Sequence, residues 1–185
     1  MKIYFGVRPP LSVRRRIASK ISSHVRQSRL PLRVQHAQHM HITTHYIGEV
    51  TEKGVVEIRR SFQKSRLPYQ SEIHLGGNSR VGTFGKEIVY LHVEDPAQLL
   101  HALKEEGRTI APVRENHSGY TPHLTLARYP KKVDLNPLLT QINVRPLDIS
   151  FTPKEVLLIH SYEKKGKKIH DIIARRRLPR GKKHL

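Results

Sequence analysis

The sequence contains neither cysteine nor tryptophan. The absence of cysteine excludes disulfide bonds, a thiolate nucleophile, cysteine-based zinc sites and iron–sulfur clusters, and it is typical of a reducing compartment. No apolar run approaches the ~20 residues of a membrane-spanning helix, and charge and proline interrupt residues 1–10 too early for a signal peptide. We therefore expect a cytoplasmic protein with no membrane segment.

Acidic residues are also scarce. The 15 Asp and Glu are outnumbered by 34 Lys and Arg, which gives a formal net charge of +19, and 13 His can add charge in mild acid. Such a surface attracts polyanions, because Coulomb attraction to phosphates supplies affinity that does not depend on nucleotide sequence. Nucleic acid is the first expected partner and an anionic membrane the second, while a basic surface that serves only solubility is the alternative without a ligand.

The spacing of apolar and turn residues predicts an α+β fold. The expected strands are 2–7, 40–47, 72–75, 87–93, 123–127, 147–151, 154–162 and 168–174, and the expected helices are 11–27, 52–63, 96–106 and 134–141. Asp95 is expected to cap the third helix and Gly107 to end it.

The two halves of the chain repeat one order of elements: strand, helix, long polar connection, then a strand that begins with His-x-Thr. This order predicts a bilobal, duplicated sheet-and-helix fold. Residues 1–185 would form a single domain, and its lobes, roughly 1–80 and 81–185, would not be independent. A site built within one chain needs no partner subunit, so we expect a monomer.

The repeated strands carry the only His-x-Thr triplets in the chain. They are His41-Ile42-Thr43 and His123-Leu124-Thr125. Because side chains alternate along a strand, the histidine and the threonine of each triplet share one face. Two imidazoles with a pKa near 6.5 form a natural acid and base pair around a phosphate, and the hydroxyl groups can hold its oxygens. Such chemistry requires no metal and no nucleophilic side chain.

The residues around the triplets, 41–49 and 122–128, resemble the two HxTx signatures of the 2H phosphoesterase superfamily. The resemblance is closest to the bacterial RNA 2',3'-cyclic phosphodiesterases, the LigT-like 2'-5' RNA ligase group. It extends through residues 3–7, 84–85 and 156–161. The first signature departs from the pattern at Thr44, where an aliphatic residue is more usual.

This resemblance implies a cytoplasmic enzyme without a metal or cofactor that hydrolyses the terminal 2',3'-cyclic phosphate of RNA to a 2'-phosphomonoester. By position in the signatures, His41 would be the proton donor to the departing 3'-oxygen and His123 the proton acceptor that activates water. Thr43 and Thr125 would hold phosphate oxygens. Reversible 2'-5' RNA ligation is a second activity that the resemblance implies.

Three further residues are candidate substrate contacts. Strict alternation places Arg128 on the face opposite His123, so it reaches a phosphate only if the strand bulges or ends there. Tyr46 and Tyr120 could stack on a base or ribose, although an aromatic residue beside a strand is more often part of the core. Basic segments at 14–16, 164–168 and in a tail from 175 onward are candidate contacts for the RNA backbone.

Two alternatives remain open. His36, His39, His41 and His45 suggest a metal site, since residues 39, 41 and 45 would share a strand face, but their spacing matches no common zinc motif. The second alternative is a non-enzymatic, basic RNA-binding protein. Such a protein would bind RNA and leave a 2',3'-cyclic phosphate intact.

Overall fold

The computed structural model describes residues 1–76, 81–84, 87–113, 119–130, 133–144, 148–165 and 167–181. Its strands are β1 (Lys2–Val7), β2 (Arg33–Val34), β3 (Ile42–Glu49), β4 (Ile73–Gly76), β5 (Val81–Phe84), β6 (Ile88–Glu94), β7 (His123–Arg128), β8 (Asp148–Phe151), β9 (Glu155–Lys164) and β10 (Lys167–Arg177). Its helices are α1 (Leu11–Ser28), α2 (Glu52–Lys64), α3 (Leu99–Ile110) and α4 (Asn136–Val144), with a short 3-10 helix η1 (Ala37–His39). The predicted α+β fold is confirmed.

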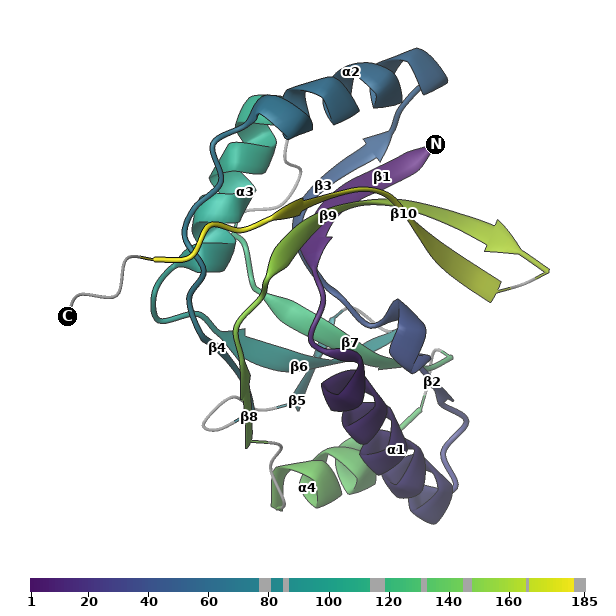
Figure 1. Cartoon of the computed structure of the whole chain (residues 1–185). Helices are drawn as coiled ribbons and strands as arrows, with labels where there is room; N and C mark the ends of the chain where they lie inside the picture. Colours follow the sequence, from purple (N-terminus) through teal and green to yellow (C-terminus); the bar gives the residue numbers. More distant parts are fainter. Residues whose placement is uncertain are drawn as a thin grey trace.

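Antiparallel pairing joins the strands in the order β10-β9-β1-β3-β7-β6-β4-β8, with β2 added to β7 and β5 to β6. The sheet curls, so that β10, β9, β1 and β3 form one half-sheet and β7, β6, β4 and β8 form the other (Figure 1). The half-sheets meet where β3 and β7 pair through Ile42 and Leu124, both fully buried. The bilobal arrangement predicted for the two HxTx strands is therefore confirmed. The first half-sheet takes its strands from both ends of the chain.

The helices pack in two pairs at opposite ends of the molecule (Figure 1). Helix α1 follows β1 in sequence but packs against β7 and α4, while α3 follows β6 but packs against β3 and α2. The buried face of α1 is Ile17, Ile21 and Val25, spaced four residues apart as an amphipathic helix requires. Because each of these helices covers the half-sheet opposite to the strand that precedes it, the two lobes share one core.

The ends of α3 differ from the prediction. Asp95 is not adjacent to the helix: its carboxylate accepts hydrogen bonds from the backbone N–H groups of Leu99 at 2.9 Å and Leu100 at 2.6 Å. Gly107 does not end the helix, which continues to Ile110. A Cβ at position 107 would lie 2.7 Å from the Cβ of His45, so the glycine permits close packing of α3 on β3.

The basic tail also differs from the prediction. Arg175, Arg176 and Arg177 do not follow the last strand, because β10 includes all three and pairs them with β9. Arg180 lies beyond the strand, whereas the predicted contacts at 182 and 183 lie outside the described residues. Elements β2, β5 and η1 were not predicted. No helix within the described ranges is long and apolar enough to cross a membrane.

Candidate active site

A cleft of about 330 Å³ opens between the two HxTx strands. Six of the seven predicted site residues line it: His41, Thr43, Tyr46, His123, Thr125 and Arg128. Its other lining residues include Lys2, Tyr4, Gln35, Ser161, Glu163, Lys168 and His170. The structure does not bring Tyr120 to this cleft.

The register of the two strands explains how the triplets converge. Ile42 pairs with Leu124 in an antiparallel arrangement, and both side chains point into the core. One residue to either side, the same register sets His41 next to Thr125 and Thr43 next to His123. Each histidine therefore has the threonine of the other triplet beside it, on the face opposite the core.

A β-bulge carries Tyr46 into the cleft. In β3, Thr43 pairs with Gly6 and His45 with Phe5, so Thr44 is an extra residue. Thr44 and His45 are both buried, at 1% and 3% exposure, which breaks the alternation of faces. The next residue, Tyr46, consequently returns to the cleft face and is 57% exposed.

The second triplet is followed by a bulge at the equivalent position. In β7, Thr125 pairs with Tyr90 and Ala127 with Val89, which leaves Leu126 extra. Leu126 and Ala127 are both fully buried, and Arg128 lies on the cleft face. The β-bulge needed to bring Arg128 to the same face as His123 is therefore present in β7.

The first bulge also removes His45 from the face expected for a metal site. Its Nε2–H donates to the carbonyl of Ala111 at 2.9 Å, inside the core. The expectation that residues 39, 41 and 45 share a face is therefore wrong. Within the described part of the chain, no group of three or more His, Asp or Glu side chains is arranged to hold a metal ion.

The hydrogen bonds of the two cleft histidines fix which ring nitrogen is available. Nδ1 of His41 lies 2.6 Å from the carbonyl oxygen of His39, and Nδ1 of His123 lies 3.0 Å from that of Thr121. A carbonyl oxygen only accepts hydrogen bonds, so both Nδ1 atoms carry the proton. Nε2 of each ring is left as the atom that can exchange a proton with a substrate.

Burial disfavours the charged form of these rings. It lowers the pKa of His41 to about 3, although the hydrogen bond to His39 opposes the shift, and the nearby His170 and Arg8 add to it. Burial likewise lowers the pKa of His123. At pH 7 both rings are therefore mainly neutral in the free protein, and the negative charge of an anion in the cleft would favour their protonation.

A third histidine, which sequence patterns did not single out, lies beside His41. The ring centroids of His170 and His41 are 4.9 Å apart, and burial lowers the pKa of His170 to about 4. Tyr4 stacks on His41 with centroids 4.9 Å apart, and its hydroxyl lies 2.8 Å from Nδ1 of His170. Burial raises the pKa of Tyr4, so the phenol stays protonated, and its hydrogen bond holds the ring of His170 beside His41. The side chain of His170 thus adds a third imidazole to the cleft.

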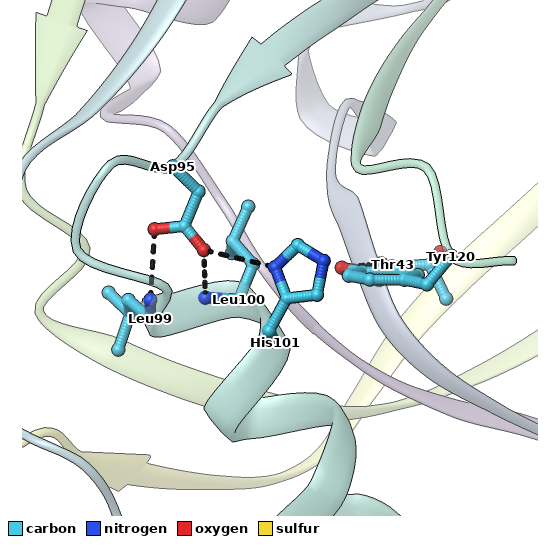
Figure 2. Close-up of polar contacts among 6 residues, drawn as sticks. All are labelled: Thr43, Asp95, Leu99, Leu100, His101 and Tyr120. Atoms are coloured by element: carbon cyan, nitrogen blue, oxygen red, sulfur yellow. Dashed lines mark hydrogen bonds and ion pairs between the residues drawn. The ribbon is translucent and has the colours of Figure 1, made fainter.

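Tyr120 lies outside the cleft lining and contacts the strand that carries the first triplet. Its hydroxyl donates to the backbone carbonyl of Thr43 at 3.0 Å, and its ring packs edge-on against His101 with centroids 5.1 Å apart (Figure 2). His101 in turn lies 3.7 Å from the buried carboxylate of Asp95, which holds the first turn of α3. These contacts connect α3 to the strand that carries the first triplet.

Comparison with known families identifies one match. The family model described as the 2'-5' RNA ligase superfamily matches residues 9–165. No curated protein matches the chain.

Solved structures show the same fold. E. coli LigT complexed with 3'-AMP is 21% identical, with 96% of each chain covered and a TM-score of 0.73. TT0787 of Thermus thermophilus is 17% identical, with 97% of this chain and 99% of that chain covered and a TM-score of 0.72. The MHV ns2 PDE domain is 13% identical, covers 83% of this chain and 88% of its own, and has a TM-score of 0.55.

Proposed function

Since the chain belongs to the 2'-5' RNA ligase superfamily, we propose that it hydrolyses the terminal 2',3'-cyclic phosphate of an RNA strand to a 2'-phosphomonoester. The resemblance to the 2H phosphoesterases drawn from the HxTx signatures is confirmed. Family membership supports an enzyme that acts on phosphodiesters. The cyclic substrate and the direction of opening are the proposed part.

The proposal rests on the observation that both triplets line one cleft. A phosphorus atom bound between His41 and His123 has an imidazole Nε2 on each side and a threonine hydroxyl beside each imidazole. Nε2 of His123 accepts a proton from water as the water oxygen attacks phosphorus. The bond from phosphorus to O3' breaks, and Nε2–H of His41 donates its proton to the departing O3'. The product keeps the phosphate on O2'.

Substrate binding itself prepares the acid. The pKa of His41 is lowered in the free protein, and the negative charge of the phosphodiester raises it again, so the ring takes up a proton more readily when substrate is bound. Thr43 and Thr125 donate hydrogen bonds to the non-bridging oxygens, and the guanidinium of Arg128 adds positive charge. The imidazole of His170 lines the same cleft beside His41.

The same site supports ligation when a different nucleophile enters. If the 5'-hydroxyl of a second RNA strand replaces water, His123 accepts the hydroxyl proton and a 2'-5' phosphodiester forms as O3' leaves. The reverse reaction uses the two histidines in exchanged roles. The net charge of +19 favours capture of RNA ends in either direction.

The test uses an oligonucleotide that ends in a 2',3'-cyclic phosphate. We expect wild type to release a 2'-phosphate end, and His41→Ala and His123→Ala each to lower kcat by at least about 100-fold. His74→Ala is the matched control, because His74 lies on β4 outside the cleft lining. Full activity in either cleft variant, or a 3'-phosphate product, contradicts the mechanism. RNA binding by wild type without any hydrolysis would favour the non-enzymatic alternative.

A further inference from the structure

A second cavity is larger than the active-site cleft. It has a volume of about 870 Å³ and lies between the start of α1 and the far half of the β9–β10 hairpin. The cationic residues that line it are Arg8, Arg14, Lys154, Arg175, Arg177 and Arg180. The one carboxylate among its described lining residues is that of Glu155, 3.9 Å from Arg175. We call it the arginine cavity.

A β-bulge in β10 places two of these cations, Arg175 and Arg177, in the cavity. Ile172 pairs with Ile159 and Ala174 with Leu158, so Ile173 is an extra residue. Without that bulge, alternation would place Arg175 and Arg177 on the face opposite His170. With it, His170 in the cleft and both arginines in the cavity share one face of β10. From residue 170 to residue 177 this face spans on the order of 20 Å.

Arg8 lines the arginine cavity and also contacts His170, a residue of the cleft. Its Nη2 donates to the backbone carbonyl of His170 at 3.2 Å, and its side chain lines the arginine cavity. Its Nε is buried and has no hydrogen-bond partner among the described residues. Helix α1 begins at the same wall after Pro10, with neither a side-chain cap nor an acidic residue in its first turn. The positive end of the helix adds to the field of the arginines.

We propose that the arginine cavity binds the backbone phosphates of the RNA strand whose cyclic end occupies the cleft. The inference rests on the proposed function and adds a second binding site to it. A polyanion fits the observations better than a single small anion, because six cations line one large cavity and two of them, Arg175 and Arg177, continue the strand face that carries His170 in the cleft. The enzyme should therefore prefer an oligonucleotide to a mononucleotide that carries the same cyclic end.

The kinetic test compares the double variant Arg175→Ala/Arg177→Ala with Arg59→Ala/Arg60→Ala, an equal loss of charge on the exposed face of α2. Substrates are a 2',3'-cyclic mononucleotide and an octanucleotide with a 2',3'-cyclic end. We expect kcat/KM for the octanucleotide to fall between about 10-fold and 100-fold in the cavity variant at about 0.05 M salt, with the mononucleotide changed less than about threefold. The α2 variant should behave like wild type on both substrates.

A binding assay separates this inference from the proposed activity. Fluorescence anisotropy of an unreactive octanucleotide with a 3'-phosphate measures affinity even if no hydrolysis occurs. Loss of two phosphate contacts should reduce the slope of log K against log salt by about 1.4, as expected for a single strand. Equal losses in the cavity and α2 variants, or a loss only in Lys164→Ala/Lys165→Ala at the hairpin tip, would overturn the proposal. So would an octanucleotide that binds no better than the mononucleotide in wild type.

Discussion

Replacing Tyr120 with phenylalanine distinguishes a structural residue from a substrate contact. The substitution removes one hydroxyl and keeps the ring, so the contacts of the ring with His101 and Lys104 persist. What is lost is the hydrogen bond to the carbonyl of Thr43, at 3.0 Å. Because Thr43 belongs to the first triplet, the loss acts on a strand that lines the candidate active site.

The size of the effect follows from the single bond that is removed. A hydrogen bond of this kind contributes about 1 kcal/mol to the free energy of unfolding. In a domain of this length, about 1 kcal/mol corresponds to about 2–4 °C in Tm. The hydroxyl does not line the cleft, so KM for a cyclic nucleotide should stay within about twofold of wild type.

Tyr46→Ala is the complementary variant. Tyr46 lines the cleft and is 57% exposed, so its truncation should raise KM and leave Tm nearly unchanged. Thermal melts and steady-state kinetics on both variants therefore separate the two roles. If Tyr120→Phe raises KM several-fold without lowering Tm, then Tyr120 contacts substrate and the supporting role drawn from Figure 2 is wrong.

Two further predictions concern protonation and close packing. Because burial lowers the pKa of both His41 and His123, and one ring must be charged while the other is neutral, kcat/KM for a cyclic mononucleotide should peak on the acid side of the ordinary imidazole pKa of about 6.5 and fall as the pH rises towards 8. A plateau from about pH 6 to 8 would contradict this. A Cβ at Gly6 would lie 2.7 Å from the backbone oxygen of Ile42, so Gly6→Ala should lower stability by about 1–3 kcal/mol and disturb the first triplet. Gly181→Ala, with no atom within 4 Å of the added Cβ, is the control for melting temperature, and equal Tm values in the two variants would refute the packing argument.

Local patterns predicted the elements well and their ends less well. The helix expected at 11–27 is α1 at Leu11–Ser28, and the strand expected at 2–7 is β1 with the same bounds. The predicted start of α3 at residue 96 was wrong, because the helix begins at Leu99. Asp95 caps it across a turn in which Gln98 has a left-handed conformation at φ 57°. Such a turn depends on packing against the sheet, which no local pattern of residues records.

Residues of the candidate site were predicted where a sequence motif contains them, and they were missed where strand pairing brings them to the cleft. His41 and His123 stand in sequence motifs, and the structure places both in the cleft. His170 stands in no motif, and it reaches His41 only because β10 pairs with β9 and β9 with β1. Tyr4 joins the same group across 166 residues of chain through its hydroxyl. Proximity of that kind follows from strand order, which sequence periodicity does not determine.

Bulges explain why strict alternation places several residues that line the two cavities on the wrong face. Thr44, Leu126 and Ile173 are each an extra residue in one strand of a pair, and each moves the residues beyond it to the other face. The first two follow the triplets at the same distance and deliver Tyr46 and Arg128 to the cleft. The third delivers Arg175 and Arg177 to the arginine cavity. In all three strands the extra residue is buried or partly buried, so the core holds the irregularity in place. Burial of the extra residue thus offsets the free energy lost where the bulge interrupts the hydrogen bonds between strands. The same packing holds the polar side chain beyond the bulge on the face that lines the cleft or the arginine cavity.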